Sequence, residues 1–413
     1  MKIAQIAPLY EAVPPKLYGG TERVVAHLCD ALVDQGHETV LFSSADAVTR
    51  AELAPVRDQA IRLDPAPLKS DLAAHMSMLA EVRRRAHEFD VLHFHVDMIH
   101  FPFFEEIAGR TLTTLHGRLD MKDLAAHMSM LAEVRRRAHE FDVLHFHVDM
   151  IHFPFFEAIA GRTITTLHGR LDMKDLAGVY QTWRQFPLVS ISNDQRRYLP
   201  EANWAGTVYH GMEPDLYRFS PRSDGYLAFL GRISPEKRPD RAIGIAKRLG
   251  RRLKIAAKVD AADANYFRNE IEPLLDHPLI EFIGEIGDHQ KSAFLGGADA
   301  LLFPIDWPEP FGLVMIEAMA CGTPVVAWGC GSAPEVIDNG VTGFIVNSDA
   351  EADQAVWRAK SLDRFAVRQR FDQRFSSAVM ASRYVELYGG LAVSNPQVGS
   401  MAKRLDPELM RIA

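Results

Sequence analysis

The sequence is poor in cysteine, lacks long hydrophobic runs and has no excess of positive charge. Its three cysteines, Cys29, Cys321 and Cys330, are an odd, sparse set without CxxC spacing, which fits a reduced, cytoplasmic protein rather than a metal site. No apolar stretch approaches the ~18 residues that a membrane-spanning helix needs. A net charge of −8 argues against nucleic-acid binding, which requires clustered Lys and Arg.

The remaining composition is that of a globular protein with two domains. The chain has 413 residues, of which 47% are hydrophobic and 24% charged. The first residues, Met1 to Pro8, have the pattern of a buried strand and not the length or cleavage pattern of a signal peptide. Strand and helix patterns alternate along both halves, which predicts an α/β protein with parallel sheets.

In the first half, strands are expected at residues 3–6 and 39–42. The helix between them is expected to have Thr21 as its N-cap and to stop at Gly36. In the second half, the expected strands are 226–230, 253–259, 280–283, 300–303 and 324–327. Residues 217–225 resemble a linker, residues 376–388 are amphipathic, and the tail beyond Gly389 is expected to be poorly ordered.

Residues 71–122 recur almost unchanged as residues 123–174. Only two positions differ, where Glu106 becomes Ala158 and Leu112 becomes Ile164. Each copy predicts a helix (71–88), a strand (91–95), a short helix or turn (99–107) and a second strand (111–115). A doubly wound sheet has one place for each strand, so the copies must compete, extend the sheet or swap between chains. Because copy two leads directly into the rest of the chain, we expect its last strand to occupy the functional place.

The most informative segment runs from Glu309 to Glu317. Pro310 and Gly312 indicate a turn, and the apolar spacing that follows predicts a helix starting near Phe311 or Gly312. The free N–H groups at a helix start favour a phosphate, and ionised carboxylates accept hydrogen bonds from hydroxyl groups. Together these features predict a site for a nucleotide-sugar.

Two further segments follow strands and open helices. In the segment Gly231 to Arg238, small residues allow close backbone approach, and Arg232 and Lys237 can neutralise phosphate. The loop containing Gly19 and Gly20 places backbone N–H groups at a helix start, although a tight turn explains the glycines equally well.

Histidines follow the strands of the repeated block. His168, or its duplicate His116, stands at the carboxyl end of a strand, where side chains face the ligand crevice. His93 and His95, with their copies His145 and His147, share one face of a strand. Two histidines without a third ligand favour a crevice-lining role over a metal site.

These motifs resemble those of retaining glycosyltransferases of the GT-B fold, in the large family 4 group. The resemblance implies that Glu309 contacts the donor sugar, Phe311, Gly312 and Leu313 the diphosphate, and Glu317 the ribose. It further implies that Gly19, Gly20, Arg232 and Lys237 bind the donor, that Gly284 and Glu285 seat the base, and that His168 supports the reaction centre. Apart from one copy of the repeat, the resemblance covers nearly the whole chain.

The expected protein therefore has two Rossmann-like domains facing a central cleft. Residues 1–216 form the acceptor-side domain, residues 217–375 the nucleotide-sugar domain, and residues 376–413 a helix that crosses back, with a tail. The expected reaction transfers a sugar to an acceptor hydroxyl with retention of configuration, without a metal or another cofactor. The acceptor is a carbohydrate, a lipid or a small molecule.

Several alternatives stay open from the sequence. One is that the duplication leaves a nucleotide-sugar-binding or self-associating protein without activity, and another is a different GT-B enzyme, such as an epimerase, which shares the fold. The repeated block offers a surface for a homodimer. The arginine triplets that start at Arg83 and Arg135 would allow peripheral membrane contact, although a solvated face explains them better.

Overall fold

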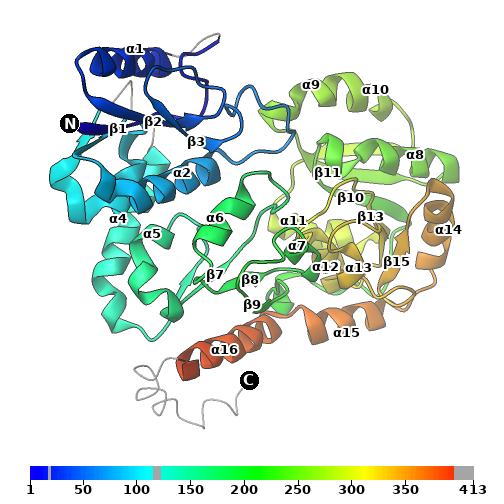
Figure 1. Ribbon diagram of the computed structural model, residues 1–413. Helices are drawn as coiled ribbons and strands as arrows, with labels where there is room; N and C mark the ends of the chain where they lie inside the picture. The colour runs from blue at the N-terminus through cyan, green and yellow to red at the C-terminus, as the bar shows by residue number, and fades with distance from the viewer. Residues whose placement is uncertain (17–19, 115–121, 395–413) are drawn as a thin grey trace.

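The computed structural model describes residues 1–16, 20–114 and 122–394, and all of its sheets are parallel (Figure 1). The first sheet has the order β3-β2-β1-β4-β5, the second β6-β7-β8-β9, and the third β12-β11-β10-β13-β14-β15. The tail was expected to be poorly ordered beyond Gly389, but residues 390–394 still belong to the last helix, and the rest of the tail lies outside the described residues. The repeat histidine His116 also lies outside them.

The strands of the first half are β1 (Lys2–Ile6), β2 (Glu38–Ser44), β3 (Glu52–Arg57), β4 (Val91–Phe94), β5 (Thr111–Thr113), β6 (Leu144–Phe146), β7 (Thr163–Thr166), β8 (Leu188–Ser190) and β9 (Trp204–Thr207). Its helices are α1 (Gly20–Asp34), α2 (Asp71–Arg85), α3 (Phe101–Phe104), α4 (Lys122–Arg137), α5 (Phe153–Phe156), α6 (Leu176–Thr182) and α7 (Asn193–Arg196).

The strands of the second half are β10 (Tyr226–Arg232), β11 (Leu253–Lys258), β12 (Ile280–Gly284), β13 (Ala298–Phe303), β14 (Val325–Trp328) and β15 (Gly343–Val346). Its helices are α8 (Pro239–Leu249), α9 (Ala264–Tyr266), α10 (Glu272–Leu275), α11 (Asp288–Gly296), α12 (Leu313–Ala320), α13 (Ala333–Val336), α14 (Asp349–Ala359), α15 (Arg364–Arg374) and α16 (Ser377–Ser394).

The repeated block divides the first half into two sheets. Copy one supplies β4 and β5, and β4 pairs with β1 from Ile3 opposite Val91 onward. Copy two supplies β6 and β7, and β7 pairs with β8 through Thr165 and Leu188. The block therefore extends the fold rather than competing for one place, and copy two holds the position that leads into the second half.

The two copies pack against each other with an approximate two-fold relationship. Arg83 of copy one lies 2.9 Å from Glu157 of copy two, and Arg135 of copy two lies 2.8 Å from Glu105 of copy one. The two pairs are equivalent, because Arg83 corresponds to Arg135 and Glu105 corresponds to Glu157 in the repeat. Helices α3 and α5, which are also equivalent, contact each other between them. The near-identical sequences thus form a self-complementary interface inside one chain.

One difference between the copies matches their different surroundings. Ile164 on β7 is fully buried and packs with Val189 and Val208 in a cluster that includes residues of α16. Its counterpart Leu112 on β5, an edge strand of the first sheet, is 53% exposed. Copy two is consequently the copy integrated into the core beneath the C-terminal helix.

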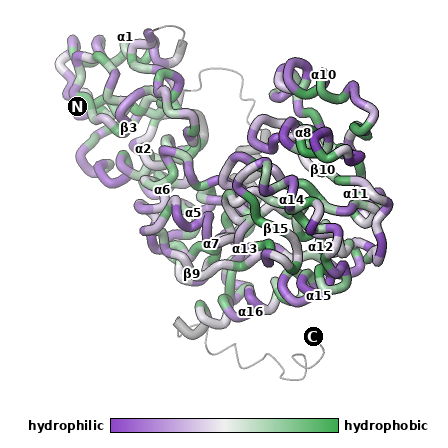
Figure 2. Tube along the Cα trace, turned by 90° about the vertical axis from the view of Figure 1, so that its right-hand side faces the viewer, coloured by the Kyte–Doolittle hydropathy of each residue, from purple (hydrophilic) through white to green (hydrophobic). Residues whose placement is uncertain are grey.

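The second half is a doubly wound domain with apolar strands. Strand β13 is buried along its whole length, and β10 and β14 flank it. Figure 2 shows hydrophobic colour gathered inside this half, around β10 and β15. Its core is formed on both faces of the sheet by two separate clusters of buried side chains.

A carboxylate contact and a long helix are among the features that join the halves. The carboxylate of Glu335 accepts hydrogen bonds from the backbone N–H groups of Asn193 and Asp194, both at 2.7 Å, and from the Tyr209 hydroxyl. Helix α16 runs from the second half back to the second sheet, where Figure 1 shows it beside β9.

Most predicted elements of the second half lie within two residues of their expected ends. In the first half, Gly36 follows α1 with a φ of +80°, as the predicted stop requires. The N-cap prediction at Thr21 is wrong, because α1 already begins at Gly20 and Thr21 lies in its first turn.

Candidate functional site

The first part of the site lies where β10 ends and α8 begins. Arg232 is the last residue of β10, and a short turn carries Lys237 before α8 starts at Pro239. Between them Arg238 adopts a left-handed conformation with a φ of +53° and is held by Asp240 and, at 2.9 Å, by Asp306. These anchors fix the turn so that Lys237 faces the start of α12.

The start of α12 requires a glycine. Gly312 precedes the helix with a φ of +78°. A Cβ atom here would lie 2.9 Å from Met315, 3.0 Å from Phe303 and 3.3 Å from Glu309. The neighbouring side chains of Met315, Phe303 and Glu309 therefore leave no room for a Cβ atom at this position. Because the first N–H groups of a helix have no partner within it, they are available to an anion there.

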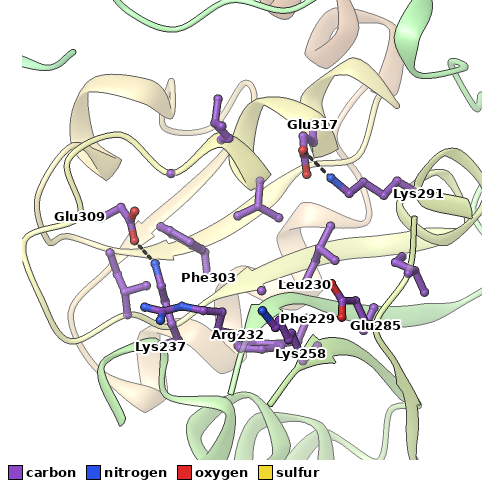
Figure 3. Close-up of a pocket in the computed structure, with 18 residues that line it drawn as sticks. Phe229, Leu230, Arg232, Lys237, Lys258, Glu285, Lys291, Phe303, Glu309 and Glu317 are labelled. Carbon is purple, nitrogen blue, oxygen red and sulfur yellow. Dashed lines mark hydrogen bonds and ion pairs between the residues drawn. The ribbon is translucent and has the colours of Figure 1, made fainter. Parts of the chain in front are cut away.

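Two ion pairs flank this helix start, one on each side (Figure 3). The Lys237 ammonium contacts the Glu309 carboxylate, and both side chains are largely buried. The Lys291 ammonium lies 2.9 Å from Glu317, which also accepts a hydrogen bond from Tyr217 at 3.2 Å. Although burial lowers the pKa of Lys291, its bonds to Glu317 and Asp288 raise it above the ordinary value. Lys291 therefore stays charged.

Around these pairs lies a cavity of about 410 Å³, which we call the C-terminal pocket. Arg232, Lys258 and Glu285 line the side of this pocket where the strands end, as Figure 3 shows. Its complete lining is Phe229, Leu230, Gly231, Arg232, Lys237, Ala256, Ala257, Lys258, Glu285, Ile286, Lys291, Phe303, Ile305, Glu309, Gly312, Leu313, Val314 and Glu317. Cations, carboxylates and apolar surface thus meet at one helix start.

His168 lies in a second group of residues beside this pocket. Its Nε2 is 2.8 Å from Nδ1 of His147, and its ring stacks on His210 with centroids 5.2 Å apart. His210 in turn meets the edge of Phe311. Burial and the nearby histidines His168 and His147 lower the pKa of His210 to about 4. These rings are therefore neutral near neutral pH.

Most of the predicted site residues come together in the C-terminal pocket. Arg232, Lys237, Glu285, Glu309, Gly312, Leu313 and Glu317 all line it. The side chain of Phe311 instead packs in the core at 2% exposure, so only its backbone can serve the helix start. Gly284 has a φ of +74° and turns the chain just before Glu285, without lining the pocket itself.

The predicted role of the Gly19–Gly20 loop stays a prediction. Gly19 lies outside the described residues, and Gly20 begins α1. Helix α1 follows β1, which pairs with β4 of copy one, whereas His168 belongs to the sheet of copy two. Consequently no described residue of the first sheet lines the C-terminal pocket or the cavity at His168.

Sequence reasoning missed several lining residues. Lys291 is on α11 and Lys258 ends β11, and neither has a motif of its own. The position of Lys258 at the carboxyl end of a parallel strand was the available signal. His210 lies in the segment that connects two sheets and had no comparable signal. Trp307 was also missed, although the Lys237 ammonium lies 4.8 Å from its ring centroid.

The site can bind an anion and hydroxyl groups together. Arg232, Lys237 and the α12 start suit a phosphate, while Glu309 and Glu317 are hydroxyl acceptors. Within the described ranges, no group of three or more His, Cys, Asp or Glu residues is arranged to hold a metal ion. The independence of metals expected from the sequence stays a prediction.

Comparison with known proteins assigns families to both halves. Residues 218–372 match Glycosyl transferases group 1, and residues 18–127 match Glycosyltransferase Family 4. The chain is 26% identical to phosphatidyl-myo-inositol mannosyltransferase of Mycobacterium leprae over 79% of this chain and 94% of that protein. It is 27% identical to D-inositol 3-phosphate glycosyltransferase of Actinosynnema mirum over 84% of both chains.

Solved structures agree with the fold. Sucrose-phosphate synthase of Thermosynechococcus elongatus superposes with a TM-score of 0.53 at 15% identity, covering 96% of this chain and all of that one. Anabaena Alr3699/HepE in complex with UDP and glucose gives 0.51 at 17% identity, covering 94% of this chain and all of that one. No helix within the described ranges has the length and apolarity to span a membrane. Both halves of the chain are thus similar to glycosyltransferases, of the group 1 type in the second half and of the family 4 type in the first.

Proposed function

We propose that the protein transfers a sugar from a nucleotide-sugar to an acceptor hydroxyl and retains the anomeric configuration. The observation that carries the proposal is the C-terminal pocket, where two lysine–carboxylate pairs flank the start of α12. Diphosphate, ribose and sugar need an anion site between two hydroxyl sites, which is the order found along this helix start. The HepE structure, which was solved with UDP and glucose, is consistent with a donor of this class.

Each part of the donor has a candidate partner in the pocket. The diphosphate would take Arg232, Lys237 and the first N–H groups of α12. Glu309, before the helix, would accept hydrogen bonds from sugar hydroxyls, and Glu317, inside it, from the ribose. Glu285, just after the turn at Gly284, would border the base. Each residue is matched to the part of the donor by its position around the cavity.

The chemistry would rest on stabilising the leaving group. As the bond between the sugar and the phosphate breaks, negative charge grows on the diphosphate, and the two cations and the helix start oppose that charge. Positive charge grows on the sugar ring beside Glu309. The acceptor oxygen would bond to the anomeric carbon on the face that the diphosphate leaves, while the departing phosphate oxygen takes the proton of that hydroxyl. Retention then requires no carboxylate nucleophile, and the protein needs no metal for the leaving group.

The test uses donor binding followed by product analysis. UDP-, GDP- and ADP-sugars are added to the purified protein without metal, and the apparent melting temperature is measured, which a ligand of the native state raises. One nucleotide series should raise it. With that donor, NMR of the early product should show the anomeric configuration of the donor. An inverted product contradicts retention, and no shift with any donor contradicts the donor site.

One observation favours a second candidate, donor binding without turnover. The Gly19–Gly20 loop leads into α1, which packs on β2 of the first sheet, whereas His168 follows β7 of the second sheet. If transfer depends on that loop, the duplicated chain binds the donor but does not turn it over. A melting shift with the donor, combined with no release of nucleotide over a panel of acceptors, would support this second function.

A further inference from the structure

A second cavity of about 570 Å³ adjoins the C-terminal pocket, and we call it the histidine cavity. It lies between the carboxyl ends of β6 and β7 and helix α16. Its lining is His145, His147, His168, His210, Gly211, Leu313, Met380, Ala381, Tyr384, Val385 and Tyr388. Leu313, the first residue of α12, lines both cavities. A molecule in the histidine cavity would therefore meet a ligand bound at that helix start.

One face of α16 forms a wall of this cavity. Met380, Ala381, Tyr384, Val385 and Tyr388 follow the helical spacing of three to four residues that places side chains on one face. A continuous hydrogen-bond network fixes the aromatic residues of this wall. The Tyr384 hydroxyl lies 2.9 Å from Thr166, which lies 2.8 Å from His145, and His145 lies 2.7 Å from the Tyr388 hydroxyl.

The histidine cavity carries no formal charge near neutral pH. No Lys, Arg, Asp or Glu occurs among the described residues that line it. Burial, with the neighbouring His147 and His168, lowers the pKa of His145 to about 4. The pKa values of His147 and His168 are also lowered, mainly by burial. The C-terminal pocket differs sharply, since Arg232 and three lysines line it.

This difference in charge decides which ligands each cavity can hold. A phosphate in the histidine cavity would lose its hydration without gaining an ion pair, which costs free energy. A neutral ring with hydroxyl groups loses less, because imidazole nitrogens and tyrosine hydroxyls both donate and accept hydrogen bonds. Aromatic side chains also provide apolar surface for the carbon faces of such a ring.

We propose that the histidine cavity is the acceptor site and that it selects an uncharged, hydroxylated ring, such as a neutral sugar, glycoside or cyclitol, held at Tyr384 and Tyr388 of α16. This proposal rests on the proposed transfer function, because it names the substrate class of that reaction. Two relatives carry names that include phosphorylated inositols. The uncharged lining gives this chain the opposite preference.

The test narrows the cavity by placing larger side chains at exposed positions of α16 that line it. Ala381 and Val385 are exposed on α16, with Val385 at 50%, so tryptophan at either position can enter the cavity without disturbing the core. The variants are Ala381→Trp and Val385→Trp. The matched control is Ser382→Trp, an exposed position on the same helix that does not line the cavity.

Each protein is assayed with the donor that raises its melting temperature. The acceptors are pairs that differ only in a phosphate: glucose and glucose 6-phosphate, mannose and mannose 6-phosphate, and myo-inositol and inositol 1-phosphate. Nucleotide release is measured with and without acceptor. We expect kcat/KM for a neutral ring to exceed that for its phosphate by about ten-fold or more. We expect both cavity-filling variants to raise the acceptor KM by about ten-fold, with Ser382→Trp unchanged.

The outcomes separate this proposal from the proposed function. If the donor does not shift the melting temperature of the unmodified protein, the donor site itself fails. If the donor binds and phosphorylated rings are preferred, or only phosphorylated rings accept sugar, the acceptor proposal is overturned. If the donor binds and no ring of either kind accepts sugar, the transfer function itself fails. It is also overturned if both tryptophan variants retain the original acceptor KM. An unchanged donor-induced shift in these variants shows that their effect is confined to the acceptor.

Discussion

Nδ1 of His147 lies 2.8 Å from Nε2 of His168, and both rings line the histidine cavity. At this distance one ring must donate a hydrogen and the other accept it, so at least one of the two is neutral. His210 stacks on His168, and His145 lies beside His147 with ring centroids 4.1 Å apart. Protonation of any ring would therefore place positive charge among close neighbours.

The first prediction concerns stability against pH. In the folded protein the pKa values of His145 and His210 are lowered to about 4 from the ordinary 6.5. Between those values the unfolded chain binds protons that the folded protein does not, so the free energy of unfolding falls as pH decreases from about 6.5 towards 4. Denaturant unfolding measured at about pH 7 and about pH 5 should show this loss.

The variant His210→Asn should reduce that loss, because it removes one group that protonates only on unfolding. His139→Asn, at an exposed position outside the cavity, should leave the pH dependence as it is. Other buried histidines, such as His152, contribute in the same pH range, so the comparison between variants is decisive. Equal pH dependence in His210→Asn and the unmodified protein would contradict the neutral cluster.

The second prediction concerns the ion pair of Lys237 and Glu309. Lys237→Ala removes a cation that opposes charge on the leaving diphosphate, and such groups typically contribute about 10²–10³-fold to kcat. Glu309→Ala removes the proposed acceptor of sugar hydroxyls and should also abolish most transfer. Both are measured by nucleotide release with acceptor. Lys360→Ala, at an exposed position of the same domain, should retain full activity. Undiminished transfer by either pocket variant would refute its assigned role.

The third prediction separates close approach from backbone strain at Gly312. Gly312→Ala introduces both a left-handed alanine and contacts of 2.9–3.3 Å, so we expect loss of stability and of the donor-induced melting shift. Gly340 has a similar φ of +82°, but a Cβ added there would meet no atom within 4 Å. Gly340→Ala should therefore lose a little stability and keep the donor shift. Equal behaviour of the two variants would show that Gly312 matters only for its φ angle.

The sequence predicts the second half of the fold and the composition of its pocket well. Strands such as β13 are apolar throughout, and the turn at Pro310 and Gly312 starts α12 where expected. Short or partly exposed strands, such as β9 and β3, carry too weak a pattern. The contact of Lys291 with Glu317 depends on how α11 packs against α12, which local spacing does not reveal.

The sequence could not predict the division of the first half into two sheets, and the reason is different. Residues Val91–Phe94 and 143–146 are identical in sequence, so local preference gives β1 two equal partners. The choice is made by tertiary packing, in which α2 packs on α6 and the two copies share their self-complementary interface. The placement of α1 beside one sheet and of His168 after a strand of another follows from that choice.

The last prediction removes one copy of the repeat. Deleting residues 71–122 or residues 123–174 leaves chains that differ only at two positions. In either chain only one copy of the block's first strand is left to pair with β1 on the side opposite β2. The second strand of that copy would then pair with β8, as β7 does now. We therefore expect one continuous sheet of seven strands in the first half. The Gly19–Gly20 loop, after β1, and the single remaining histidine, His116 or His168, would then follow strands of the same sheet. Donor binding, measured by melting shift, should be tighter than in the full chain.

The two deletions are matched controls for each other. The chain lacking residues 123–174 places Leu112 where Ile164 is now buried beneath α16. An exchange of Ile for Leu in a packed core costs less than about 1.5 kcal/mol, so this chain should be the slightly less stable of the two. Denaturant unfolding gives that difference directly. If both single-copy chains fold but bind the donor no better than the full chain, the separation of the two sheets has no consequence for the site. If only one of them folds, the copies are not interchangeable as neighbours of β1 and β8.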